Sequence, residues 1–362
     1  MPATIRDVAR VAGVSVATVS RALNGAQNVL PGTRQKILDA ARELRFTPSV
    51  AARSLITRRT DTIGALLPDL HGEYFSELIR GIDQAARARG LHLLVSSSHG
   101  DADEAAAALR AMNGRVDGLV VMSPHADAAF LQHNLPANLP AVLLNTATAL
   151  PGHARFMVDN FGGAQALTQH LSAGGRKRVA FIGGPEGNDE ALQRLAGYRS
   201  ALHAGQREMV FEGDFTEDSG RSAGRRMAQL RQRPDAVFAA NDMMAVGCMS
   251  ALQEAGVRVP EDITVGGFDD IPIARYVSPT LTTIRVPIAS LGSAALNALV
   301  RSLDSATPRS EHTMVMPVEL VVRRSCGAAR NGSAIPQPIP QAYSATLSAS
   351  LSPPLPLHSA LS

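Results

Sequence analysis

A short run of hydroxyl-bearing and basic side chains near the N-terminus has the chemistry needed to contact nucleic acid. The run contains Ser15, Thr18, Ser20 and Arg21. Hydroxyls can hydrogen-bond to phosphate oxygens, and a guanidinium can read the edge of a guanine. If the run is helical, it could lie in the major groove of DNA with its N-terminal residues at the base edges.

The surrounding residues predict two short helices joined by a tight turn. Thr4 can cap a first helix, and Asp7, three residues later, would complete a capping box. Gly13 suits the turn, and Ser15 is the next natural N-cap. Apolar residues then repeat every three to four positions, which predicts a second helix over Val16–Leu23.

A helix-turn-helix unit needs a small residue where its helices cross, a residue that tolerates the turn, and an apolar residue that holds the second helix against the first. Ala9, Gly13 and Val19 meet these needs in that order. A third helix from about Thr33 to Leu44 would complete a miniature core that ends at Pro48. The same pattern also fits a small three-helix unit that binds no nucleic acid. Helical periodicity alone does not decide between them.

Charge is unevenly distributed along the chain. Residues 1–60 contain nine Arg and one Lys against three acids, a net charge of +7, so the rest of the chain carries −4 of the total of +3. A basic head on a mildly acidic body is typical of a module that neutralises phosphates. A solvated basic surface is the alternative.

From Thr62 onward, short apolar runs alternate with helical patterns, which predicts a two-lobed α/β domain with mainly parallel sheets. The runs are Ile63–Leu67, His92–Ser96, Gly118–Met122, Ala141–Leu144, Val179–Gly183, Ala236–Ala239 and Ile263–Gly266. They are too many for one sheet, so we expect two subdomains with a cleft between them. The predicted domains are an all-α headpiece at 1–48, a hinge and linker at 49–60, the two-lobed domain at 61–328 with crossings near 160, 287 and 319, and a disordered tail at 329–362.

Two polar pairs follow predicted strands of this body. Asn241-Asp242 follows Ala236–Ala239, and Asp269-Asp270 follows the last strand. Ligands of such sheets bind at the carboxyl ends of the strands, and this mixture of amide and carboxylate groups suits a polyol. Asn241 or Asp269 could instead simply cap the helix that follows.

Residues 4–25, from Thr-Ile-Arg-Asp-Val-Ala to Ala-Leu-Asn-Gly, resemble the headpiece of the LacI/GalR family of bacterial repressors almost position for position. Further matches occur at Thr33-Arg34, Pro48 and Ala52-Arg53-Ser54-Leu55, and the resemblance continues to about Cys326. It implies a set of DNA-contacting residues: Thr4, Ser15, Val16, Ala17, Thr18, Ser20, Arg21, Asn24, Thr33, Ala52 and Leu55.

The resemblance also implies roles within this set. Ala52 and Leu55 would belong to a hinge helix, with Leu55 wedged into the minor groove at a central base step. Val16 and Ala17 can contact thymine methyls but not read a base bidentately, so Arg21 is the better guanine reader. Two departures from the family pattern lie at the hinge: Ser49 stands where the family usually has Asn, and Arg45-Phe46 replaces the common Gly-Tyr.

The body resembles the family's periplasmic-binding-protein-like effector domain, in which two lobes close on a sugar or another metabolite. The implied effector-binding residues are Tyr74, Phe75, Asn145, Arg194, Phe215, Asn241 and Asp269. Arg194 would grip ligand hydroxyls, although it could also form a surface ion pair. Glu73 and Asn145-Thr146 depart from the family pattern, and Glu73 would disfavour an acidic ligand if it faces the cleft.

Other classes of protein are less consistent with the sequence. It has no nucleotide fingerprint, nucleophile elbow or metal-spaced cluster, so an enzyme is disfavoured and no cofactor or metal is expected. Cys248 and Cys326 are the only cysteines, and no apolar run approaches the roughly 20 residues of a membrane span. A secreted solute-binding protein would match residues 62–325, but it would need a signal sequence and would not explain the basic head.

We therefore expect a cytoplasmic repressor that associates with the nucleoid when bound to DNA. Its predicted partners are double-stranded operator DNA with a pseudopalindromic site, a sugar or related effector, and a second copy of the chain. Relatives that form tetramers use a C-terminal leucine repeat, which Pro353, Pro354 and Pro356 interrupt here. The prediction is accordingly a homodimer without a membrane partner.

Overall fold

The computed structural model describes residues 3–23, 28–46, 59–124, 127–146, 148–173, 175–203, 205–303 and 312–327. Asn24, Ala52 and Leu55, most of the predicted hinge, and the tail after residue 327 lie outside these ranges. The predicted boundaries at residues 48 and 328 also lie outside them and stay predictions.

The headpiece contains α1 (Ile5–Ala12), α2 (Val16–Leu23) and α3 (Pro31–Glu43). Gly13 ends α1 in the left-handed region at φ 68°, which turns the chain sharply into α2. The helix-turn-helix geometry predicted from Ala9, Gly13 and Val19 is therefore present. The three helices enclose a small core of buried residues: Val8, Ala9, Val19, Ala22, Val29, Ile37, Ala40 and Ala41.

The third helix differs in detail from its prediction. It begins at Pro31 rather than at Thr33, because a proline at the first helical position loses no hydrogen bond and has its φ already set. Ile37, Ala40 and Ala41 face the core, whereas the neighbouring Leu38 is 37% exposed. On this helix the core is therefore closed by one large aliphatic side chain and two alanines.

The first lobe contains a six-stranded sheet in the order β11-β5-β4-β3-β1-β2. Neighbouring strands are parallel, as predicted. The elements of this lobe are β1 (Thr62–Leu67), α5 (Glu73–Arg87), β2 (His92–Ser97), α6 (Ala102–Met112), β3 (Gly118–Met122), α7 (Ala128–Asn134), β4 (Ala141–Leu144), β5 (Ala154–Val158), α12 (Ile288–Leu303) and β11 (Thr313–Met316).

The second lobe contains a six-stranded sheet in the order β12-β10-β9-β8-β6-β7. Within this sheet only β12 runs antiparallel to its described neighbour. The elements of this lobe are α8 (Asn160–Ser172), β6 (Val179–Ile182), α9 (Asp189–Ser200), β7 (Met209–Phe211), α10 (Glu217–Gln229), β8 (Ala236–Ala239), α11 (Asp242–Glu254), β9 (Thr264–Asp269), η1 (Pro272–Arg275), β10 (Thr282–Arg285), β12 (Glu319–Val321) and η2 (Arg324–Cys326).

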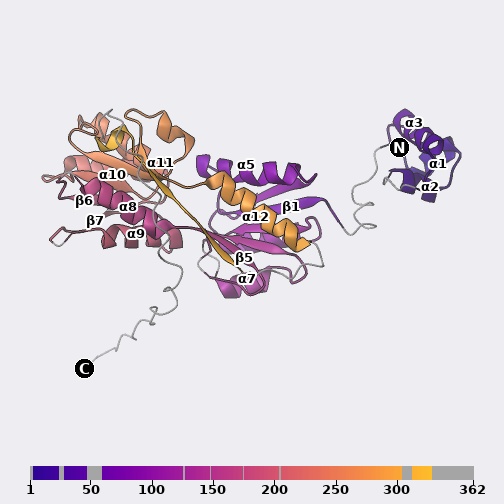
Figure 1. Cartoon of the computed structure of the whole chain (residues 1–362), viewed down its shortest axis with the longest axis horizontal. Coiled ribbons are helices and arrows are strands. Elements are labelled where there is room, and N and C mark those ends of the chain that lie inside the picture. The colour runs from indigo at the N-terminus through magenta and orange to yellow at the C-terminus, as the bar shows by residue number, and fades with distance from the viewer. Residues whose placement is uncertain are drawn as a thin grey trace, which may run out of the picture.

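The chain passes between the two sheets after β5, after β10 and after β11. Helix α12 is thereby returned to the first lobe, where Figure 1 shows it in orange beside the violet α5. The two helices approach closely at Gly81, where an added Cβ would lie 2.0 Å from the carbonyl oxygen of Ala289. Late parts of the sequence therefore complete a lobe that early parts begin.

All seven apolar runs predicted as strands are strands, with one informative difference. The strand predicted to end at Gly266 continues to Asp269, so Asp269 is the last residue of β9. The carboxyl end of this strand therefore presents the Asp269 side chain at the edge of the sheet where a ligand is expected.

Two kinds of feature are absent from the part of the chain that the structure describes. It contains no group of three or more His, Cys, Asp or Glu side chains suited to a metal ion. None of the helices described above is both long and apolar enough to cross a membrane.

Candidate DNA-reading surface and effector cleft

Helix α2 exposes the side chains predicted to read DNA and buries those predicted to hold it in place. Val19 and Ala22 lie in the headpiece core, while Val16 is 42% exposed and Ala17 and Arg21 are exposed. Within the described residues, Arg21 forms no ion pair or side-chain hydrogen bond. Its guanidinium is available to a base edge or a phosphate.

Several hydroxyl groups that were predicted to contact DNA already form hydrogen bonds within the headpiece. Ser15 caps α2, because its Oγ accepts a hydrogen bond from the main-chain N–H of Thr18 at 3.2 Å. The hydroxyls of Ser15 and Thr18 share one hydrogen bond of 2.9 Å, which leaves one hydroxyl hydrogen of the pair for a phosphate. Ser20, on the same helix, is half-buried.

Thr4 is more fully engaged. Its hydroxyl and its main-chain N–H both donate to the carboxylate of Asp7, at 2.7 and 3.0 Å. These hydrogen bonds, with another from Arg10, lower the pKa of Asp7 to about 2. Thr4 thus has no unengaged donor for a phosphate, which weakens the prediction that it contacts DNA.

The first turn of α3 contains a residue whose role the sequence did not indicate. Arg34 donates from Nη1 to the carbonyl oxygen of Ala22 at 2.7 Å, and so ties α3 to the end of α2. Its neighbour Thr33, a predicted DNA contact, is half-buried in the same turn. Arg34 therefore positions the reading helix, and the only signal for it was the Thr33-Arg34 match.

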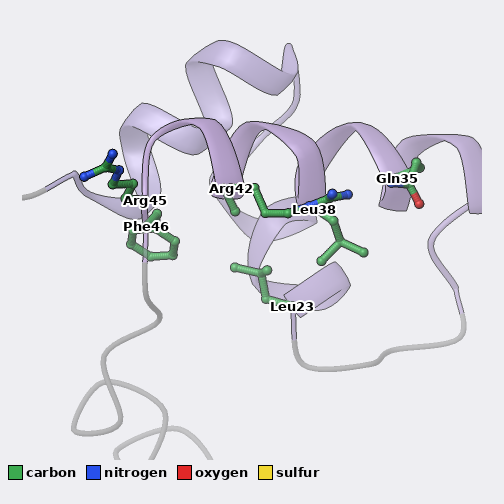
Figure 2. Close-up of a pocket in the computed structure, with 7 residues that line it drawn as sticks. Leu23, Gln35, Leu38, Arg42, Arg45 and Phe46 are labelled. Atoms are coloured by element: carbon green, nitrogen blue, oxygen red, sulfur yellow. The ribbon is translucent and has the colours of Figure 1, made fainter.

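A cavity of about 490 Å³ lies between the last turn of α2 and α3. All the residues around it belong to the headpiece, and none is a predicted effector contact. Figure 2 shows this lining, formed by Leu23, Gln35, Leu38, Ala41, Arg42, Arg45 and Phe46.

Arg194 on α9 is the centre of the predicted effector site and is only 3% exposed. Its Nε donates to Asn160 Oδ1 at 2.8 Å, and its Nη1 donates to the carbonyl oxygen of Ala240 at 2.6 Å. The guanidinium also lies over the ring of Phe268, 4.0 Å from the ring centre. Such burial excludes the alternative that Arg194 forms a surface ion pair.

Two buried carboxylates share this guanidinium. Arg194 Nη2 lies 3.4 Å from Asp269 Oδ1 and 3.6 Å from Glu190 Oε1. Burial raises the pKa of Glu190, and it raises the pKa of Asp269 to about 7 despite the neighbouring cation. The cluster therefore combines two acidic groups and one cation in a site shielded from solvent.

Asn145, on the turn after β4, connects the first lobe to this cluster. Its Nδ2 donates to Glu190 Oε1 at 2.9 Å and to the hydroxyl of Tyr74 at 3.2 Å. Burial of that hydroxyl beside Glu190 and Asp269 raises the pKa of Tyr74. Tyr74, Asn145, Arg194 and Asp269, predicted separately, are thus brought together across the two lobes.

The remaining predicted contacts line the cluster or support it. The ring of Phe75 packs edge-on against Tyr74, with centres 5.5 Å apart, and the ring centre of Phe215 lies 5.7 Å from the Arg194 guanidinium. Asn241 caps α11, because its Oδ1 accepts from the N–H of Met244. Its Nδ2 donates to the carbonyl oxygen of Phe215, so Asn241 has the capping role that the sequence left open.

Comparison with known proteins agrees with both parts of this geometry. Residues 4–49 match "Bacterial regulatory proteins, lacI family", and residues 168–326 match "Periplasmic binding protein-like domain". The HTH-type transcriptional repressor PurR of Erwinia tasmaniensis is 36% identical over 330 residues, which cover 89% of this chain and 96% of that protein. The chain belongs to the LacI family of bacterial regulatory proteins.

Other members give the same result. The ribose operon repressor of Escherichia coli strain K12 is 35% identical over 324 residues, covering 87% of this chain and 98% of that protein. The structure of the Lac repressor dimer bound to operator and the anti-inducer ONPF superposes with a TM-score of 0.81 at 30% identity, covering 91% of this chain and 100% of that one. The predicted family, fold class and function as a DNA-binding transcriptional regulator are confirmed.

The predicted effector site of this LacI-family chain also contains strained backbone. Asn145, Phe215, Asp269 and Asp270 adopt positive φ angles of 47°, 72°, 112° and 55°, which non-glycine residues rarely do. Strained residues of this kind concentrate at ligand sites, where the surrounding structure holds them in place. Their location marks the edge between the lobes independently of side-chain chemistry.

Two side chains of the predicted effector site were missed in the sequence: Glu190 and Asn160, which both contact Arg194. Asp242, which the sequence paired with Asn241 after a strand, is buried and accepts hydrogen bonds from the Thr283 hydroxyl and the N–H of Ile271. Burial and the charge of Asp269 raise the pKa of Asp242 well above its usual range. Glu190 lies one helical turn before Arg194, a spacing that could have indicated it.

Glu73 does not project its carboxylate freely into the cleft. Its Oε2 accepts a hydrogen bond of 2.8 Å from the N–H of Ile273, on η1 of the second lobe. Asp270 is similarly engaged, with Arg285 and Arg323. Glu73 therefore joins the lobes at the rim, and the acidic character of the interior comes from Glu190 and Asp269.

Proposed function

We propose that this chain is a repressor that binds a pseudopalindromic operator as a homodimer, and that a sugar or related metabolite between its lobes changes operator affinity. The observation that carries the proposal is the buried cluster of Arg194, Asp269, Glu190 and Asn145, which spans both lobes of a chain with a helix-turn-helix headpiece. The Lac repressor dimer bound to operator and the CelR–cellobiose complex, the latter at 31% identity and a TM-score of 0.66, support it.

On DNA, α2 would lie in the major groove with its exposed face toward the bases. Arg21 would donate to a guanine, and the small apolar side chains of Val16 and Ala17 would contact thymine methyls. The net charge of +7 on residues 1–60 would supply non-specific affinity that falls steeply with salt. The hinge residues Ala52 and Leu55 would add contacts in the minor groove when two headpieces bind side by side.

In the body, an effector would act by changing how the lobes close. The Asn145–Glu190 and Glu73–Ile273 hydrogen bonds join the lobes in this structure. A ligand inserted beside Arg194 would exchange some of these contacts for its own, and the resulting shift would alter the spacing of the two hinges. Coupling of this kind is typically about 1–3 kcal/mol between the two sites.

The proposed setting of this activity is the cytoplasm, with the chain on the nucleoid whenever it is bound to its operator. The chain would regulate by binding alone and would catalyse no reaction. The support for both statements is the family, whose members compared above are named as transcriptional repressors.

The DNA-reading part can be tested by selecting an operator from random duplexes and measuring affinity by fluorescence anisotropy. Arg21→Ala should weaken binding to the selected operator by about 10-fold or more while changing non-specific binding much less, since one bidentate base contact contributes about 1–3 kcal/mol. Arg87→Ala removes the same charge from an exposed position on α5 and should leave operator affinity unchanged. Equal behaviour of the two variants would contradict the role of α2.

A further inference from the structure

We infer that the cleft selects an effector that presents hydroxyl or amine donors and excludes anionic effectors, and that Glu190 is the residue that sets this selectivity. The inference rests on the proposed effector function of the cleft and narrows the class of ligand. It would exclude sugar phosphates, sugar acids and nucleotides, while it would admit neutral and amine-bearing polyhydroxylated compounds.

The charges in the cleft are the first support. Arg194 is the cation at its centre, and Glu190 and Asp269 lie 3.6 and 3.4 Å from the same guanidinium nitrogen. At the neighbouring edge, Arg155 on β5 and Asp189 on α9 add one charge of each sign. Among these five groups, the acids outnumber the bases by three to two.

The hydrogen-bonding groups give an independent second support. The Nε and Nη1 groups of Arg194 donate to Asn160 and Ala240, and its Nη2 faces the two carboxylates. Among the described residues of this cleft, the buried side-chain atoms left without a hydrogen bond are Asn145 Oδ1 and Asp269 Oδ1. The first is an acceptor, and the second is an acceptor when its carboxyl group is ionised. Asp269 Oδ1 lies at ion-pair distance from Arg194 without the geometry of a hydrogen bond.

A ligand that satisfies Asn145 Oδ1, and Asp269 Oδ1 in its ionised form, must donate hydrogen bonds. Hydroxyl and amine groups do so, whereas carboxylate and fully ionised phosphate groups only accept. An anion would also have to leave water for a buried site whose one guanidinium already faces two acidic groups, which is costly. The raised pKa values of Glu190 and Asp269 reflect the same resistance to further negative charge.

Glu190 is the residue that distinguishes this arrangement from a simple Arg–Asp pair. It is buried, lies one turn before Arg194, and accepts the hydrogen bond from Asn145 of the opposite lobe. A ligand donor can replace the Asn145 amide at the same carboxylate oxygen. Glu190→Gln would retain an oxygen that accepts from Asn145 while removing one negative charge, so it should admit anions.

The test uses the full-length protein and sets of probes that share a carbon skeleton. Each set contains a neutral aldose, its 2-amino-2-deoxy derivative, its aldonic acid and its 6-phosphate, measured by thermal shift and then calorimetry. A salt concentration of about 0.2 M suppresses weak binding of anions to the basic headpiece. We expect binding to be confined to neutral or amine-bearing members, with their anionic counterparts weaker by about 10-fold or more.

Three variants test the assignment to Glu190. Glu190→Gln should reduce the discrimination against the anionic counterpart by about 10-fold or more, and Glu190→Asp, which keeps the charge, should retain it. Glu261→Gln makes the same change of charge at an exposed position before β9, at the end of the strand away from the cleft, and should change nothing. If Glu190→Gln does not fold, the wild type and Glu190→Asp still test the exclusion of anions.

An anionic probe that binds the wild type more tightly than its neutral counterpart would overturn the inference. So would the failure of every neutral and amine-bearing probe to bind, or unchanged discrimination in folded Glu190→Gln. Operator binding measured on the same preparations separates these results from a failure of the proposed function. Operator binding that persists, together with tight binding of an anion, would leave the regulator intact and the ligand class wrong.

Discussion

At the scale of single residues, the cleft is dominated by the competition for one guanidinium. Arg194 contacts Asn160, the carbonyl oxygen of Ala240 and two acids. The Oδ1 atoms of Asp269 and Asn145 nevertheless have no hydrogen bond. Unsatisfied buried acceptors cost about 1–3 kcal/mol each, and they are rare in cores. Their presence in one place is better explained by a ligand than by packing.

The raised pKa of Asp269 predicts a pH dependence of stability. Its pKa of about 7 lies above that of an unfolded Asp, about 4, so the folded state binds the extra proton between these values. The wild type should therefore lose stability as pH rises from about 4 to 7. The free energy of unfolding of Asp269→Asn, measured with urea, should not fall over this pH range. Relative to that of the wild type, it should increase by on the order of 2–4 kcal/mol between about pH 4 and 7.

A second aspartate provides the control for this measurement. Asp262 is hydrogen-bonded to Arg258, which lowers its pKa to about 2, so its contribution to stability is lost only as pH falls below about 4. Asp262→Asn should therefore shift the free energy of unfolding by a constant amount between about pH 4 and 7. A difference between Asp269→Asn and the wild type that does not change with pH would contradict the raised pKa.

The candidate site was predictable from the sequence only in part. Arg194, Asp269 and Tyr74 were indicated by motif and by position after a strand, but the hydrogen bond between Asn145 and Glu190 joins residues on different lobes. Thr4 was predicted to contact DNA and Asn241 to contact an effector, but in the structure their polar groups form local capping hydrogen bonds. Sequence identifies the chemistry that is available, and tertiary contacts decide which groups remain free.

At the scale of elements, the turn between α1 and α2 depends on Gly13. Its φ of 68° suits glycine, and an added Cβ would meet no atom within 4 Å, so backbone strain alone sets the cost of a substitution. Gly13→Ala should destabilise the headpiece by about 1–2 kcal/mol. Hydrogen exchange of the α1 and α2 amides in the full-length protein should accelerate roughly 5- to 30-fold.

Gly32 provides a matched control for Gly13. It lies in the first turn of α3, has no positive φ, and also has open space around its missing Cβ. Gly32→Ala should slow exchange in the headpiece modestly, since it reduces the freedom of the unfolded chain by about 0.4–1 kcal/mol. If both substitutions have the same effect, the strain argument is wrong.

The elements were predictable wherever periodicity was strong. Val16–Leu23, Gly118–Met122 and Ala236–Ala239 have the predicted bounds. The strands that were missed are short, and they either lie at a sheet edge, as β7, β11 and β12 do, or contain a half-buried arginine, as β5 and β10 do. Such strands are specified by the neighbour they pair with, which local patterning does not encode.

At the scale of the whole molecule, specific binding should require two chains on one operator. The headpiece offers a single reading helix, which contacts too few bases for useful specificity by itself. Light scattering of the purified protein should therefore give the mass of a dimer. A tetramer would contradict the argument from Pro353, Pro354 and Pro356 in the tail.

The hinge gives a second prediction at this scale. Leu55 lies outside the described residues, and its role as a minor-groove wedge follows from the family resemblance. Leu55→Ala should weaken operator binding by roughly 10-fold or more, because burial of the leucine between base pairs offsets the cost of unstacking them. The headpiece should stay folded. Leu230→Ala removes an equivalent side chain from an exposed position after α10 and should have no effect on operator affinity.

Occupancy of the cleft is proposed to change affinity for DNA. The dissociation constant for the selected operator should therefore be measured by anisotropy with and without a saturating cleft ligand from the probe sets. We expect a change of about 5- to 150-fold in either direction, corresponding to a coupling of about 1–3 kcal/mol. An operator affinity that stays the same when the cleft is filled would contradict the proposed coupling.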